Sequence, residues 1–167
     1  MPQFIAVDHA ACTGCRECEV VCSLYHFGEC NPERSAIRVI RREKDGLVEP
    51  LPLVCQQCEQ APCMEACPTK AIFREGDGDV LTIDPEKCSG CGECTEACPA
   101  GLIFMDKQRD VAICCDLCGG DPQCAVLCHS RCLTLAKEDG AGSRDRVYGL
   151  AKIREKVMEG NGRRSNP

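Results

Sequence analysis

Tryptophan is absent from this chain of 167 residues, and two tyrosines and four phenylalanines are its only Phe, Trp or Tyr residues. The hydrophobic fraction of 44% includes nineteen cysteines, so a conventional apolar core would be thin for this length. Bound cofactors are therefore expected to fill much of the interior and to supply much of the folding free energy. The length suits one or two small domains.

Other absences narrow the function. The N-terminal stretch MPQFIAVDHAACTGC has neither a basic nor an apolar region of the kind that forms a signal peptide, and no apolar run reaches membrane-spanning length. We therefore expect a cytoplasmic protein without a membrane span. The formal net charge is −6, with no basic patch interleaved with aromatics, so no nucleic-acid partner is expected. No nucleophile–base pair and no dinucleotide or phosphate-loop fingerprint is present, so catalysis by the chain itself is not expected.

Cysteine is what the chain has in abundance. Sixteen cysteines form four sets, each beginning CxxC and ending CxxxC. The sets are Cys12, Cys15, Cys18 and Cys22; Cys55, Cys58, Cys63 and Cys67; Cys88, Cys91, Cys94 and Cys98; and Cys115, Cys118, Cys124 and Cys128. Two-residue gaps let one loop bind several corners of a 4Fe-4S cube, and a distant cysteine closes the cube. The pattern predicts four 4Fe-4S clusters, with the sixteen cysteines as iron ligands.

Disulfides and zinc are the alternatives for so much cysteine. Disulfides need an oxidising compartment, for which there is no targeting signal. Structural zinc usually takes two separated CxxC pairs or mixtures with histidine, and the three histidines have no ligand-like spacing. Prolines after Cys67 and Cys98 complete the bacterial ferredoxin pattern. A cysteine-rich zinc-binding assembly or interaction protein remains the competing hypothesis.

An internal repeat indicates the fold. Residues 7–22 match residues 83–98, and the second and fourth sets also resemble each other, as duplication of a two-cluster unit would produce. We predict an α+β fold, a duplicated bacterial-type two-cluster ferredoxin with short β hairpins and short helices around four clusters. Short strands are expected at Phe4–Val7, Ala36–Ile40, Ala71–Arg74, Leu81–Ile83, Ile103–Met105, Val111–Ile113 and Leu133–Ala136. Short helices are expected at Arg16–Ser23, Pro62–Ala66, Glu93–Ala97 and Pro122–Leu127.

The remaining segments complete the expected organisation. The alternation within 31–52 suggests a hairpin that caps a cluster. Residues 1–136 are expected to form the four-cluster domain, made of two interleaved ferredoxin-like units. A polar linker over 137–146, an amphipathic helix over 147–159 and a disordered tail over 160–167 are expected to follow. The C-terminal helix either packs back on this domain or docks on a partner.

The four sets, over about residues 3–136, resemble the four-cluster electron-transfer subunits related to the iron–sulfur subunits of dimethyl sulfoxide reductase and formate dehydrogenase. The resemblance implies a non-catalytic subunit that takes electrons from a tungsten- or molybdenum-containing catalytic subunit. The acceptor would be a soluble ferredoxin or a flavin subunit. The compact fourth set is most similar to small members that accompany tungsten aldehyde oxidoreductases. Hydrogenase, formate dehydrogenase and carbon monoxide dehydrogenase subunits are the alternatives.

The resemblance also implies how the sets share ligands. In the family the pairing is nested, second set with third and first with fourth, and each last cysteine closes its partner's cube. Carried over, the inner cubes are Cys55, Cys58, Cys63 and Cys98, and Cys88, Cys91, Cys94 and Cys67. The outer cubes are Cys12, Cys15, Cys18 and Cys128, and Cys115, Cys118, Cys124 and Cys22.

Three cysteines and two histidines have less certain roles. Cys114 could replace Cys115, although the CxxC spacing of the other sets favours Cys115. Cys30 and Cys132 are expected to be small buried side chains rather than extra ligands. His26 and His129 could donate hydrogen bonds to cluster sulfur, but ordinary packing or surface positions are favoured.

Overall fold

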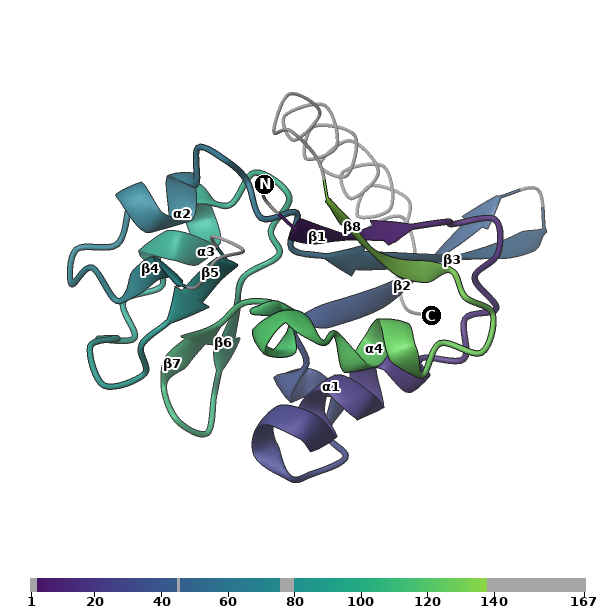
Figure 1. The fold of residues 1–167 in the computed structure, drawn as a ribbon, viewed down its shortest axis with the longest axis horizontal. Helices are drawn as coiled ribbons and strands as arrows, with labels where there is room; N and C mark the ends of the chain where they lie inside the picture. Colours follow the sequence, from purple (N-terminus) through teal and green to yellow (C-terminus); the bar gives the residue numbers. More distant parts are fainter. Residues whose placement is uncertain (1–2, 45, 76–79, 138–167) are drawn as a thin grey trace, which may run out of the picture.

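The computed structural model describes residues 3–44, 46–75 and 80–137. Within these ranges, eight strands pair as four antiparallel two-stranded sheets, and short helices connect them (Figure 1). The strands are β1 (Gln3–Val7), β2 (Ile37–Lys44), β3 (Leu47–Val54), β4 (Ile72–Glu75), β5 (Val80–Ile83), β6 (Phe104–Asp106), β7 (Val111–Ile113) and β8 (Leu133–Lys137). The helices are α1 (Glu17–Phe27), α2 (Pro62–Glu65), α3 (Glu93–Ala97) and α4 (Gln123–Val126), with 3₁₀ helices η1 (Pro32–Arg34) and η2 (Leu117–Gly120).

The expected elements are present at their expected places, with small differences in length. Each of the seven expected strands overlaps an observed one, and β3 is the second strand of the hairpin expected within 31–52. Helix α1 continues past Ser23 to Phe27 and ends at Gly28, whose φ of 69° is the left-handed conformation that terminates many helices. The predicted helix over 147–159 and the predicted tail lie outside the described residues, as does the predicted linker beyond Lys137, which ends β8.

Pairing between distant strands brings the ends of the described chain together. Strand β1 pairs with β8 from Gln3↔Lys137 to Val7↔Leu133, and the two lie side by side in Figure 1. Because β1 leads into the first cysteine set and β8 follows the fourth, this pairing places those sets next to each other. Helices α1 and α4 pack together below it. Between the second and third sets, β4 pairs with β5 and α2 packs on α3.

The β2–β3 hairpin is the longest sheet, paired from Ile37↔Val54 to Lys44↔Leu47. Strand β3 contains Pro50 and Pro52, which a two-stranded sheet tolerates because each of its strands is an edge. The base of the hairpin is buried at Leu53 and Val54. Its function in the fold is to cover the cysteine-containing interior, as the sequence led us to expect.

The interior is shared between aliphatic side chains and cysteines. Ile5, Ile37, Leu81, Leu117 and Leu133 are almost fully buried. They belong to one cluster of buried residues that also contains six of the sixteen set cysteines: Cys22, Cys55, Cys63, Cys94, Cys115 and Cys124. The thiols are therefore part of the core and not a surface feature.

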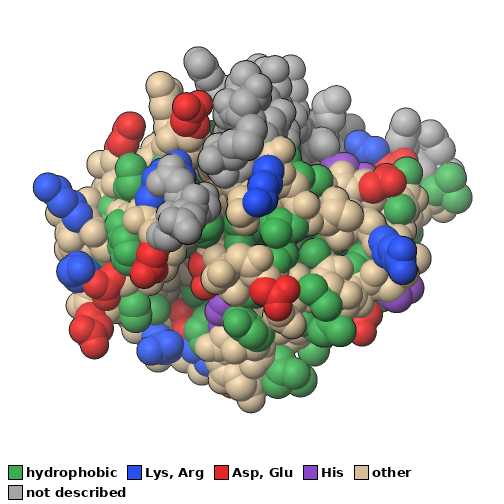
Figure 2. Space-filling view, in the orientation of Figure 1, with side chains coloured by type: hydrophobic (Ala, Val, Ile, Leu, Met, Phe, Trp, Pro, Cys, Tyr) green, Lys and Arg blue, Asp and Glu red, His purple; other side chains and the backbone are tan. Residues whose placement is uncertain are grey.

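The surface carries mixed charge. On the face drawn in Figure 2, Lys and Arg side chains lie among Asp and Glu side chains. Within the described ranges, no helix is both long enough and apolar enough to cross a membrane.

Candidate iron–sulfur sites

Two cavities lie between the second and third cysteine sets. Site 2 is lined by three cysteines of the second set and the last one of the third: Cys55, Cys58, Cys63 and Cys98. Site 3 is lined by the reciprocal group, Cys67, Cys88, Cys91 and Cys94. Helices α2 and α3 produce this exchange because each carries the third cysteine of its set and directs the chain that follows toward the neighbouring cavity.

Site 4 is a third cavity, and it joins the fourth set to the first. It is lined by Cys115, Cys118 and Cys124 together with Cys22 from α1. Three of these four side chains are buried, and only Cys118 is partly exposed. The pairing of β1 with β8 and the packing of α1 on α4 make this meeting of distant residues possible.

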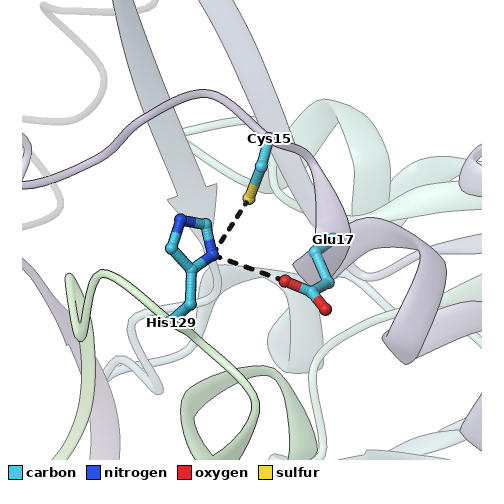
Figure 3. Close-up of side chains that lie close together, drawn as sticks. All are labelled: Cys15, Glu17 and His129. Atoms are coloured by element: carbon cyan, nitrogen blue, oxygen red, sulfur yellow. Dashed lines mark hydrogen bonds and ion pairs between the residues drawn. The ribbon is translucent and has the colours of Figure 1, made fainter.

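Site 1 is the group predicted from the four set cysteines that remain, Cys12, Cys15, Cys18 and Cys128. His129, the neighbour of Cys128, places Nδ1 4.0 Å from Sγ of Cys15 and 3.5 Å from a carboxylate oxygen of Glu17 (Figure 3). The loop that carries Cys128 therefore lies against the first set. Cys15 is exposed, so site 1 lies at the surface of the molecule.

Three cavities thus contain the groups of four that the nested pairing predicts for sites 2, 3 and 4. The group of site 1, and the binding of iron at any of the four sites, stay predictions.

Burial controls the protonation of the site thiols before a metal binds. It raises the pKa of Cys55 and Cys124 to about 12, and that of Cys63 and Cys94 to about 11. Neighbouring thiols in the same group also raise these pKa values, because two thiolates repel each other. Iron ligation requires thiolates, so loading each site would release protons. A bound metal cation would stabilise these buried sulfur atoms as thiolates.

Backbone amides point at the sulfur atoms that close the sites. The amides of Ala71 and Leu102 each donate to the cysteine four residues earlier, Cys67 and Cys98, at 3.2 Å. The amide of Ala36 donates to Cys22 at 3.4 Å. Hydrogen bonds of this kind stabilise the thiolate and orient it toward a metal.

Two histidines lie beside predicted ligand cysteines. Nε2 of His26 is 3.6 Å from Sγ of Cys118 and 3.4 Å from a carboxylate oxygen of Asp116. His129 contacts Cys15 as described above. His129 is exposed, as a surface histidine would be, and His26 is partly buried. Both rings nevertheless lie within 4.0 Å of the sulfur of a predicted ligand, so hydrogen bonding to that sulfur stays a prediction.

The three surplus cysteines have different environments. Cys30 is exposed, so the expectation of a buried side chain is wrong there: it follows α1 in a turn that faces solvent. Cys132 is buried, with Sγ 3.5 Å from Sγ of Cys128. Cys114 lines site 2, whereas Cys115 lines site 4, which agrees with the preference for Cys115 in the fourth set.

Gln57 is a residue that the sequence analysis missed. Its buried side-chain amide donates to the carbonyl oxygen of Cys115 at 2.6 Å, and its side-chain oxygen accepts from the amide of Leu81 at 2.8 Å. It therefore connects the loop of site 4 to the β4–β5 hairpin. Glutamine between two cysteines has no recognisable pattern, so only the fold could reveal this contact.

Comparison with known proteins shows the family to which the chain belongs. Residues 48–138, more than half of the chain, match the family described as the 4Fe-4S dicluster domain. The chain belongs to this family and is an iron–sulfur protein.

Particular relatives are electron-transfer subunits. The chain is 40% identical over 126 residues to the polyferredoxin-like subunit of aliphatic sulfonate oxidoreductase from Pyrococcus furiosus, covering 75% of this chain and 71% of that protein. It is 29% identical to the thiosulfate reductase electron transfer subunit PhsB of Salmonella typhi, covering 79% and 74% respectively. Among solved structures, the BamBC active-site complex of benzoyl coenzyme A reductase with benzoyl-CoA matches at a TM-score of 0.48 and 24% identity, covering 92% of this chain and 91% of that one.

Proposed function

We propose that this protein is the electron-transfer subunit of an oxidoreductase complex and relays single electrons through four 4Fe-4S clusters. The observation that carries the proposal is the exchange of last cysteines between sets, which brings four thiols together in each of three cavities. A ferredoxin-type pair of cubes needs this exchange. With sixteen cysteine ligands, every iron of four cubes has a cysteine bound, so no iron has an open coordination position for a substrate. The reaction of the complex would therefore take place on another chain.

The proposed ligands follow the four sites. Site 1 uses Cys12, Cys15, Cys18 and Cys128; site 2 uses Cys55, Cys58, Cys63 and Cys98; site 3 uses Cys88, Cys91, Cys94 and Cys67; and site 4 uses Cys115, Cys118, Cys124 and Cys22. Each cluster would supply one reversible one-electron step. The chain holds the sulfur atoms in place, donates hydrogen bonds to them and surrounds them with apolar side chains that limit access of water.

The sites follow one another as a series. Besides burial, Cys124 of site 4 lies near enough to raise the pKa of Cys18 of site 1, and Cys55 of site 2 likewise raises that of Cys115 of site 4. Cys94 of site 3 contributes in the same way to the raised pKa of Cys114 in the wall of site 2. The exposed cysteines Cys15 and Cys91 belong to sites 1 and 3, the two ends of this series. We therefore place the exchange of electrons with other proteins at these ends.

The partner is the finer part of the proposal. We propose a tungsten- or molybdenum-containing catalytic subunit as the donor, with an aldehyde oxidoreductase as the first choice. Hydrogenase, formate dehydrogenase and carbon monoxide dehydrogenase subunits are the alternatives. A ferredoxin or a flavin subunit would receive the electrons. The relative from Pyrococcus furiosus supports a catalytic oxidoreductase partner, because it is itself a subunit of aliphatic sulfonate oxidoreductase.

Metal analysis tests the function directly. Anaerobically purified protein should contain about sixteen iron atoms and about sixteen acid-labile sulfides per chain. It should also give a paramagnetic signal after reduction with dithionite. Bound zinc without sulfide would reject the proposal in favour of a zinc scaffold.

A further inference from the structure

Cys132 is a buried thiol outside the four predicted ligand groups. Only 4% of the residue is exposed, and its Sγ lies 3.5 Å from Sγ of Cys128. The side chain therefore lies against site 1, immediately before β8.

The equivalent positions in two other sets show what is special about Cys132. The residue four positions after the last cysteine is Ala71 in the second set and Leu102 in the third. Both donate their backbone amide to that cysteine. In the fourth set this position is Cys132, which brings a side-chain S–H where alanine and leucine have none. Site 1 can therefore receive a hydrogen bond that sites 2 and 3 cannot receive from this position.

The proposed ligation decides which of the two sulfur atoms donates. Cys128 is proposed as an iron ligand, so its sulfur is a thiolate, which can only accept a hydrogen bond. Cys132 lies outside the four ligand groups, and its thiol is the group of the pair that has a proton to donate across 3.5 Å. Sγ of Cys128 also lies 3.6 Å from the Ser130 hydroxyl, which can donate to it as well.

We propose that Cys132 is not an iron ligand but donates an S–H···S hydrogen bond to the Cys128 thiolate, and that this bond raises the reduction potential of the site 1 cluster. The inference rests on the proposed function, because it takes Cys128 as a ligand of site 1. A reduced cluster carries one more negative charge, so donors to its sulfur ligands stabilise the reduced form more than the oxidised form. The Ser130 hydroxyl acts on Cys128 in the same direction.

The test compares two changes at one position. Cys132→Ala removes the donor, whereas Cys132→Ser replaces it with a hydroxyl that still donates. Cys114→Ala is the matched control: Cys114 is a surplus cysteine whose Sγ lies 3.7 Å from the Leu81 carbonyl oxygen instead of a ligand sulfur. Each protein is titrated anaerobically with electron paramagnetic resonance detection. The site 1 component is assigned as the one that Cys15→Ser perturbs.

We expect Cys132→Ala to keep about sixteen irons. At the wild-type midpoint potential, its ratio of reduced to oxidised site 1 cluster should fall about two- to tenfold, as loss of one hydrogen bond implies. Cys132→Ser should stay closer to the wild type, and Cys114→Ala should leave the site 1 component unchanged.

Two results would overturn the inference. An unchanged site 1 potential in Cys132→Ala would show that the bond does not tune the cluster. Loss of about four irons from Cys132→Ala would make Cys132 a ligand instead of a donor. These results can be distinguished from failure of the proposed function, in which case the wild-type protein itself would lack iron and sulfide.

Discussion

Cys98 belongs to the third cysteine set in the sequence but lies in the cavity lined by the second. The amide of Leu102 donates to its Sγ at 3.2 Å, which holds the sulfur in place as a thiolate would require. Its C-cap position at the end of α3 directs the side chain away from Cys94, although only four residues separate the two. A single residue thus tests whether the cubes share ligands across sets.

Cys98→Ala should damage the site 2 cluster and spare the site 3 cluster. We expect up to about four of sixteen irons to be lost, with the site 3 paramagnetic component retained. Cys114→Ala is the control, since it makes the same chemical change in the wall of the same cavity and should retain all the iron. Selective loss of the site 3 component would contradict the proposed exchange.

At the scale of elements, the loop of site 3 lies directly against the β6–β7 turn. Gly90, in the Cys88–Cys91 loop, has a φ of 70°, and a Cβ atom there would lie 2.6 Å from the carbonyl oxygen of Asp110. Gly92 has a similar φ of 79°, but a Cβ atom there would approach no atom closer than Thr95 Oγ1 at 3.9 Å. Comparing substitutions at the two glycines therefore distinguishes the effect of backbone strain, which both share, from that of a clash with the β6–β7 turn, which only Gly90 has.

Gly90→Ala should destabilise the iron-loaded protein more than Gly92→Ala. Both changes incur about 1–2 kcal/mol for a left-handed conformation, and Gly90→Ala adds about 1–3 kcal/mol for the displaced turn. The measurement is thermal unfolding, together with the rate of iron release to a chelator. Equal effects of the two changes would mean that the turn does not press on the loop.

At the scale of the whole molecule, a buried ion pair connects elements far apart in sequence. Nη2 of Arg34 in η1 lies 2.6 Å from Oδ2 of Asp106 at the end of β6, and Nε of Arg34 donates to the same oxygen at 3.1 Å. Both residues are buried. The pair joins the segment after the first cysteine set to the hairpin after the third, so it fixes the two cluster pairs relative to each other.

Asp106→Asn should lower the free energy of unfolding by up to about 3–5 kcal/mol, because it removes the buried counter-charge of the Arg34 guanidinium and leaves only the more exposed Glu29. Glu29→Gln is the matched control: Glu29 also pairs with Arg34, at 3.1 Å, but is more exposed, so the expected loss is at most about 1 kcal/mol. Denaturant unfolding of the iron-loaded proteins measures both. A loss in Asp106→Asn no larger than the control would show that the pair does not stabilise the fold.

The same pair gives stability a defined dependence on pH. Burial alone would raise the pKa of Asp106, but hydrogen bonds from Arg34 and from the amide of Gln108 outweigh it and lower the pKa. A carboxyl group whose pKa is lower in the folded state stabilises fully above its ordinary pKa of about 4. That contribution disappears as the pH falls through the lowered value. The difference between wild type and Asp106→Asn should therefore shrink in acid and stay constant above about pH 5.

Much of the local structure was predictable because ligand spacing and local propensity both act over a few residues. The CxxC and CxxxC intervals located the candidate ligands, and the short helices were expected where the CxxxC intervals lie. Cys30 was placed wrongly because cysteine type alone favours burial, whereas the turn after α1 exposes it. Gln57 was missed because its partners, Cys115 and Leu81, are far away in the sequence.

The sequence by itself determined the inorganic chemistry: the number, type and spacing of the thiols decide which metal centre the chain can bind. Only the tertiary structure decided which thiols meet, since β1–β8 pairing and α1–α4 packing join residues more than 100 positions apart. It also decided which side chains surround each sulfur group. The physical reason is that ligand identity is a property of single residues, whereas burial and hydrogen bonding depend on every element that packs around them.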